Sequence, residues 1–129
     1  MKINHTHHIA VNTKDINESI QFYQDIMGFR LHSQADMGDC VLVYMQVSED
    51  TFIELFDLKG GCRDGETSEI QAGLKHIAFD VDDIFAWDKF LKEKGIPYVL
   101  EMTELHPIGK RVLLVADPNG VVVELCADL

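Results

Sequence analysis

The feature of this sequence that most constrains its fold is an internal repeat. Residues 8–16 and residues 76–84 both read His-Ile-Ala, then four residues, then Asp-Ile. Each half later closes on an apolar run that contains one glutamate, Glu54 in the first half and Glu124 in the second. The chain therefore consists of two copies of one unit, and each copy offers one histidine and one glutamate at matched places.

The length of the chain suits one domain made of these two copies. With 129 residues and 47% hydrophobic content, it can bury one core, whereas each half alone would be marginal. We therefore expect the halves to pack on each other or on a second chain. The predicted organisation is a single domain over 1–129, with module one at about 1–58, a Gly-rich and charged linker at about 59–73, and module two at about 74–129.

The hydrophobic period changes within each half from two to about 3.6 and back to two. This pattern predicts a strand, a helix and three strands, in that order, in both modules. Asp15 is a helix N-cap candidate, Gly28 and Gly95 mark helix ends, and Asp-Pro-Asn-Gly at 117–120 predicts a hairpin turn. The expected strands lie near 7–12, 29–34, 40–47, 51–58, 74–81, 97–101, 111–116 and 121–127, and the expected helices at about 16–27 and 83–94.

The charge of the chain excludes some partners. A net charge of −11 and a pI of about 4.7 argue against nucleic acid and against an anionic membrane surface. No apolar run has the length of a membrane span, and the N-terminus lacks the apolar core of a signal peptide, so we expect a cytoplasmic protein. The three cysteines lack metal-binding spacing and are expected to be reduced thiols: Cys40, Cys62 and Cys126.

The repeated histidines and glutamates are candidates for a metal site. Residues two apart in a strand share a face, and each candidate would point away from the aliphatic residues that suit packing against a helix. A buried, unpaired glutamate is costly, but two of them facing two histidines are accommodated by a divalent cation. Nitrogen and carboxylate ligands together suit Ni, Co, Zn, Fe or Mn and leave positions open for water or a substrate oxygen. The predicted ligands are His8, Glu54, His76 and Glu124.

Other residues fall into two groups. Met45, Phe52 and Phe56 are candidate pocket walls, although core packing explains them equally well. Four histidines have no partner in the repeat and are assigned to the surface or to loops: His5, His7, His32 and His106.

These motifs resemble the vicinal-oxygen-chelate superfamily, which includes glyoxalase I, methylmalonyl-CoA epimerase, extradiol dioxygenases, and fosfomycin and bleomycin resistance proteins. The resemblance rests on the two His-Ile-Ala strands, the helix that ends at Met27-Gly28-Phe29, and the Asp-Pro-Asn-Gly hairpin before Val-Glu-Leu. It implies an α+β fold in which two tandem βαβββ modules form a curved mixed sheet with helices on the convex face. It also implies a homodimer that acts on a small molecule.

The resemblance carries the ligand set over residue by residue, and His8, Glu54, His76 and Glu124 together are similar to the bacterial glyoxalase I set. It implies a metal-dependent, glyoxalase I-like (lactoylglutathione lyase-like) enzyme that moves a proton through a metal-stabilised enediolate, with Glu54 or Glu124 as the base. The alternatives are a methylmalonyl-CoA epimerase-like isomerase, an Fe-dependent extradiol-type dioxygenase, and a metal-free binding or resistance protein. Asn12 and Leu58 stand where glyoxalase I carries groups that grip glutathione, while Lys110 and Arg111 are alternative anion anchors.

Overall fold

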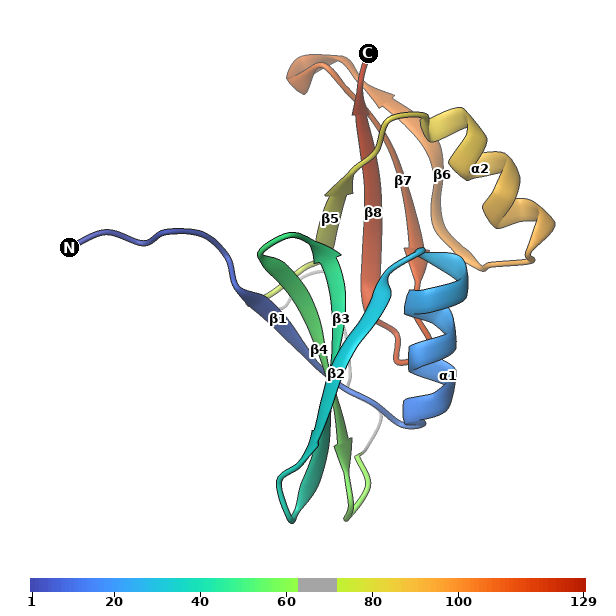
Figure 1. Cartoon of the computed structure of the whole chain (residues 1–129). Helices are drawn as coiled ribbons and strands as arrows, with labels where there is room; N and C mark the ends of the chain where they lie inside the picture. The colour runs from blue at the N-terminus through green and yellow to red at the C-terminus, as the bar shows by residue number, and fades with distance from the viewer. Residues whose placement is uncertain (63–71) are drawn as a thin grey trace. The chain divides into compact units, whose positions relative to one another are not determined.

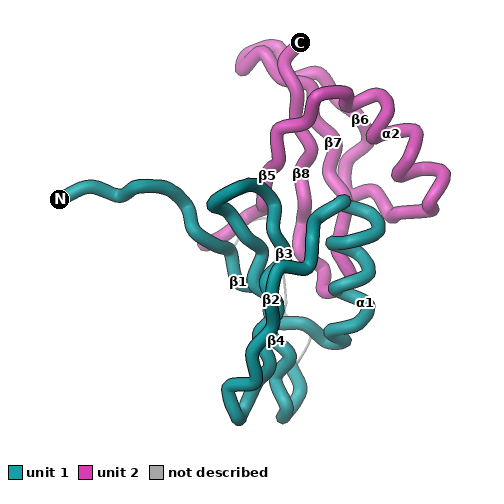
Figure 2. Tube along the Cα trace, in the orientation of Figure 1, with its two compact units in different colours: residues 1–65 teal, residues 66–129 magenta. Residues whose placement is uncertain are grey.

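The computed structural model describes residues 1–62 and 72–129, which form two compact units divided after residue 65 (Figures 1 and 2). Both units run strand, helix, three strands. Unit 1 contains β1 (His8–Asn12), α1 (Ile16–Gln21), η1 (Phe22–Ile26), β2 (Arg30–Asp36), β3 (Cys40–Ser48) and β4 (Thr51–Leu58). Unit 2 contains β5 (Ile77–Asp80), α2 (Ile84–Glu93), β6 (Tyr98–Leu105), η2 (His106–Ile108), β7 (Lys110–Ala116) and β8 (Val122–Asp128).

Each unit has its own four-stranded mixed sheet, and the two sheets have the same topology. The strand orders are β1-β4-β3-β2 and β5-β8-β7-β6. The first strand of each unit pairs in parallel with the last, while the remaining neighbours are antiparallel. The predicted α+β fold of tandem βαβββ modules is confirmed, with the mixed sheet built as one four-stranded sheet in each module.

Both helices begin at a capping aspartate, and the sequence indicated the first of these, Asp15. Asp15 Oδ1 accepts the backbone N–H groups of Asn17 and Glu18, and Asp83 Oδ1 does the same for Phe85 and Ala86. These bonds satisfy donors that the first turn of a helix leaves unpaired.

The first helix departs from the expected regular form at its C-terminal end. It finishes as a π-helical turn, in which the Met27 N–H donates to the carbonyl of Phe22 over 3.0 Å. Gly28 and Gly95 follow the two helices with φ of +74° and +67°, a conformation that glycine adopts without strain.

One face of each sheet packs against the helix of its own unit. In unit 1, α1 contacts β4, and in unit 2, α2 contacts β7 and β8. The side chains on this face are almost completely removed from water, which contributes about 1.5–3 kcal/mol for each large aliphatic residue. They are Val11, Val43, Met45, Ile53 and Leu55 in unit 1, and Ile77, Leu113, Val115, Val123 and Leu125 in unit 2.

Three further expectations concern the hairpin turn, the linker and the cysteines. Asp117 Oδ1 accepts the N–H groups of Asn119 and Val121, so the predicted hairpin turn is confirmed. Residues 63–71 of the expected 59–73 linker lie outside the described residues. The three cysteines are free thiols: Cys40, Cys62 and Cys126.

Among the described residues, none of the helices is long and apolar enough to cross a membrane.

Candidate metal centre

The first histidine–glutamate pair lies on the sheet face of unit 1 that is turned away from α1. Ala10 on β1 lies directly beside Glu54 on β4, and His8 precedes Ala10 by two residues, so its side chain shares that face. His8 Nε2 is 3.8 Å from Glu54 Oε1, which is too long for a hydrogen bond. The two side chains therefore face each other across a gap.

Glu54 is a buried carboxylate with few partners. Its side chain is only 7% exposed. Tyr44 lies directly across from it on β3, and the tyrosine hydroxyl donates a hydrogen bond to the carboxylate, which raises the pKa of Tyr44. One hydroxyl does not satisfy the two oxygens of a carboxylate, so the remaining lone pairs favour a cation at this place.

The Nδ1 atom of His8 is hydrogen-bonded to the preceding residue, His7. His7 Nδ1 and His8 Nδ1 are 2.8 Å apart, so one ring donates its proton to the other. This contact occupies Nδ1 of His8 and leaves Nε2 directed at Glu54. Metal-binding histidines usually have such a partner on the second ring nitrogen, because it fixes the orientation of the ring.

The second pair lies at the equivalent place in unit 2. Ala78 on β5 lies beside Glu124 on β8, and His76 precedes Ala78 by two residues, just before β5 begins. His76 Nε2 is 3.3 Å from Glu124 Oε2. Among the described residues, the buried Nδ1 of His76 has no hydrogen-bond partner, so one ring nitrogen remains unused in either tautomer.

The distance between the two ligand atoms within each pair is compatible with both atoms binding the same ion. Two ligand atoms that each lie about 2.1 Å from a metal are about 3.0 Å apart at a right angle and about 3.4 Å apart at a tetrahedral angle. The observed 3.3 Å falls in this range, and the observed 3.8 Å needs a small closure. In the described part of each unit, no third His, Cys, Asp or Glu joins the pair, so each pair by itself offers one imidazole and one carboxylate.

The two pairs differ in what lies across the strand from the glutamate. Tyr44 faces Glu54, whereas Leu114 faces Glu124. The side chain of Glu124 is also the more exposed of the two, at 17% against 7%. Glu54 is therefore held by a hydrogen bond, and Glu124 is the carboxylate with more room to move.

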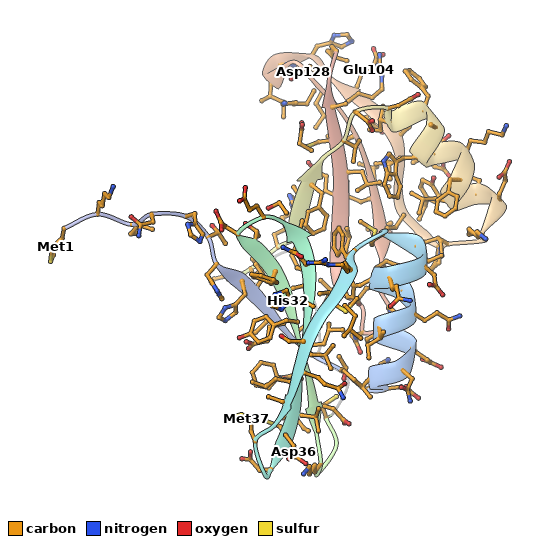
Figure 3. The ribbon with its side chains drawn as sticks, viewed as in Figure 1. Met1, His32, Asp36, Met37, Glu104 and Asp128 are labelled. Atoms are coloured by element: carbon orange, nitrogen blue, oxygen red, sulfur yellow. The ribbon has the colours of Figure 1, made fainter. Side chains whose placement is uncertain are left out.

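The neighbouring side chains only partly follow expectation. Phe52 packs edge-on against Tyr44 on the face that carries His8, with ring centroids 5.6 Å apart. Met45 lies on the opposite face and is fully buried, so of its two expected roles, pocket wall or core packing, the structure supports core packing. His32 was expected on the surface or in a loop, and it is exposed, but it lies within β2 beside Phe52 (Figure 3).

The two cations expected as anion anchors are occupied by acidic partners. Lys110 Nζ lies 2.7 Å from Asp128, and Arg111 lies 2.6 Å from Glu104 with its guanidinium over the ring of Phe85. Their solvated, structural role therefore fits the geometry better than a role in substrate binding.

Comparison with known proteins identifies the family. The model of the Glyoxalase/Bleomycin resistance protein/Dioxygenase superfamily matches residues 5–125. The chain belongs to this superfamily.

Individual relatives span most of the chain but carry different names. A probable lactoylglutathione lyase of Synechocystis sp. is 29% identical, covering 92% of this chain and 91% of its own length. The metallothiol transferase FosB of Staphylococcus epidermidis is 32% identical over 97% of this chain and 82% of its own length. Among solved structures, a glyoxalase family protein from Enterococcus faecalis superposes with a TM-score of 0.82 at 24% identity, covering 98% of this chain and 99% of that one.

Within the superfamily fold, the structure adds three residues that the repeat alone does not indicate. Tyr44, His7 and Arg30 have no counterpart of the same type at the matched places of the second module. Tyr44 and Arg30 become visible only through strand register, because register decides which side chains share a face with Glu54 and His8.

Proposed function

We propose that this member of the superfamily is a metal-dependent, glyoxalase I-like enzyme whose metal ligands are His8, Glu54, His76 and Glu124. The observation that carries the proposal is the equivalence of the two pairs. In both units the glutamate lies beside an alanine on the first strand, and the histidine stands two residues before that alanine. Each pair supplies two ligands, and the two modules together supply four, from one chain or from two copies.

The chain's own groups suit a proton transfer. A bound divalent ion would polarise vicinal substrate oxygens and acidify the adjacent C–H bond. One of the two glutamates then acts as the base, taking a proton from one carbon and returning it to the neighbouring carbon. Phe52 and Tyr44 form an aromatic wall beside His8, which limits the access of water to the reacting carbons.

A second candidate is thiol transfer, and it is favoured by one specific comparison. The 32% identity to a metallothiol transferase covers nearly the whole chain. The two candidates make different demands on Glu54. The lyase needs it as a fourth ligand, whereas a site of two histidines and one glutamate would leave it outside the metal sphere.

Metal content tests the ligand set. We expect the purified protein, loaded with nickel, cobalt or zinc, to hold a stoichiometric ion by elemental analysis. His8→Ala and His76→Ala should each lose it while the circular dichroism spectrum persists. His32→Ala, which removes an exposed imidazole beside Phe52, is the matched control and should retain the ion. Unchanged metal affinity in His76→Ala would refute the proposed site.

Glu54→Gln separates the two candidate reactions. Under the lyase proposal, the variant should lose metal affinity and isomerisation of 2-oxoaldehyde–thiol adducts together. If it instead keeps its metal and transfers a thiol to an electrophilic acceptor at the wild-type rate, the transferase is the better assignment.

A further inference from the structure

In unit 1, a row of residues that lie side by side on neighbouring strands runs from His8 of the candidate metal centre to the positively charged Arg30. Arg30 on β2 lies opposite Gln46 on β3, Gln46 lies opposite Phe52 on β4, and Phe52 lies beside His8 on β1. Residues directly opposite each other in a sheet project to the same face. Arg30 and His8 therefore share one face, at the two ends of a single row.

A β-bulge in β2 sets this arrangement. The register of β2 against β3 shifts between Leu31 and Ser33, which leaves His32 as the extra residue. The imidazole of His32 lies against Phe52, with ring centroids 5.2 Å apart, and Nδ1 of His32 is 3.0 Å from the Ser33 hydroxyl. Phe52, the aromatic residue of the row, thus forms an aromatic surface with two residues beside the row, His32 and Tyr44.

The guanidinium of Arg30 is held in place without being neutralised. It donates to the side-chain carbonyl of Gln46, and the amide nitrogen of Gln46 donates in turn to the backbone carbonyl of Glu49 over 3.3 Å. Within the described residues, Arg30 has no carboxylate partner. This is notable in a chain with 22 acidic and 11 basic residues, where Arg111, Lys59, Lys92 and Lys110 all have such partners.

We propose that Arg30 is a specificity-determining residue that binds an oxyanion, a carboxylate or a phosphate, at the far end of the substrate. A guanidinium presents paired N–H donors that match such groups, and one bound only to a neutral amide keeps its full charge for a ligand. Adjacent strands are about 4.8 Å apart, so the side chain, which leans toward Gln46, places its charge about 10 Å from His8.

This inference rests on the proposed function, and it narrows the substrate class. The substrate carries its metal-binding oxygens at one end and an anionic group about 10 Å away, joined by a segment that packs on the aromatic surface. Asn12 and Leu58, at the places where the resemblance implies a grip on glutathione, carry no positive charge, so Arg30 supplies an anchor from a different strand.

The test uses binding rather than turnover. The probes are adipic acid monohydroxamate, which joins two vicinal chelating oxygens to a carboxylate through a short alkyl chain, its methyl ester, and the matching phosphonate. Binding to the zinc-loaded protein is measured by calorimetry at low and high ionic strength. Wild type should bind at least one of the anionic probes about ten- to a hundredfold more tightly than the ester, in keeping with a charge-assisted bond, and salt should reduce this preference.

Three variants locate the preference. Arg30→Gln should bind the acid and the ester equally, while Arg111→Gln should keep the wild-type preference, because its guanidinium is already paired with Glu104. Gln46→Glu supplies an internal carboxylate to Arg30 and should also abolish the preference, without a change in ester binding.

The outcomes separate this inference from the proposed function. If wild type binds the ester but shows no preference for either anion, or if Arg30→Gln retains that preference, the role of Arg30 is refuted and the metal centre stands. If wild type binds none of the hydroxamates, the metal centre fails, and the anchor fails with it. Preference for the carboxylate over the phosphonate, or the reverse, identifies the anionic group.

Discussion

Tyr44 lies directly opposite Glu54 on neighbouring strands, and its hydroxyl donates a hydrogen bond to that buried carboxylate. The matching position in unit 2 is Leu114, opposite Glu124. The two halves of the candidate site therefore share a backbone register but differ in one side chain, and this difference distinguishes their glutamates.

Tyr44→Phe should weaken metal binding without unfolding the protein. Removal of an outer-shell hydrogen bond typically costs about 10- to 100-fold in metal affinity, and the ring volume is almost unchanged. Competition with a chromogenic chelator measures the effect. Tyr98→Phe removes a hydroxyl that bonds Asp88 of α2, on the sheet face of unit 2 opposite to the one that carries Glu124, and should leave the affinity as in wild type.

His7→Ala should also lower the affinity for metal, by about tenfold or more, because it removes the partner of His8 Nδ1. His5→Ala is the matched control, since His5 is exposed and its ring centroid is 6.5 Å from that of His7. Equal metal affinities in His7→Ala and His5→Ala would show that the hydrogen bond with His7 does not contribute to metal binding by His8.

Turnover of the methylglyoxal–glutathione hemithioacetal should be weak, and a different thiol adduct or a small 2-hydroxy-carbonyl compound should be better. Asn12 and Leu58 lack the positive charge that would hold glutathione at those positions, and binding energy from remote groups of a substrate contributes to the rate as well as to affinity. Steady-state kinetics with the nickel- or cobalt-loaded enzyme decide this. A specificity constant near the upper range of efficient enzymes would contradict it.

The protein is expected to form a homodimer. Each four-stranded sheet has two edge strands with unpaired backbone groups, which a second copy can cover. Every residue of β2, one of these edges, is exposed in the single chain. Light scattering at micromolar concentration checks the mass, and a monomer under these conditions would contradict the expectation.

Stability should fall at alkaline pH through Tyr98. Burial, together with a 2.8 Å hydrogen bond to Asp88, raises the pKa of Tyr98. The neighbouring charges are Asp88, Glu101 and the Lys92 ammonium, whose own pKa is raised chiefly by its bond to Asp88. The pKa of Tyr98 in the folded protein exceeds the unfolded value of about 10. The contribution of the Tyr98 hydroxyl to the free energy of unfolding is therefore complete below about pH 10, and it is lost as pH rises through the pKa of the folded protein.

Urea unfolding across this alkaline range measures the loss. Tyr98→Phe should be less stable than wild type near neutral pH and should show a flatter dependence at high pH. A wild-type curve parallel to that of Tyr98→Phe would show that the hydroxyl does not couple to folding.

The repeat predicts much of the fold because its signals are local. The Asp15 cap of the first helix, the glycines that follow both helices and the Asp117 turn act within a few residues of themselves, and the structure confirms them. The π-helical end of the first helix was not predicted, because a change from four to five residues per hydrogen bond leaves the apolar pattern almost unaltered.

Register was the part that the sequence could not provide. Ser48 pairs with Thr51 next to the turn, and a regular ladder from that pair would place Met45 opposite Glu54. A shift at Val47 moves the register by one residue, so Tyr44 faces the carboxylate and Met45 enters the core. A single extra residue in a strand moves the side chains that follow it to the opposite face of the sheet, and the composition does not indicate where this happens.

The bulge at His32 bears on how chain length can vary among relatives. Because the extra residue is already looped out of the ladder, its deletion would restore regular pairing and leave Arg30 opposite Gln46 and Ser33 opposite Tyr44. An edge strand of this kind can lose its bulged residue while the guanidinium of Arg30 keeps the same face, so we expect a length change at His32 to leave the proposed anchor in place, whereas a substitution of Arg30 would remove it.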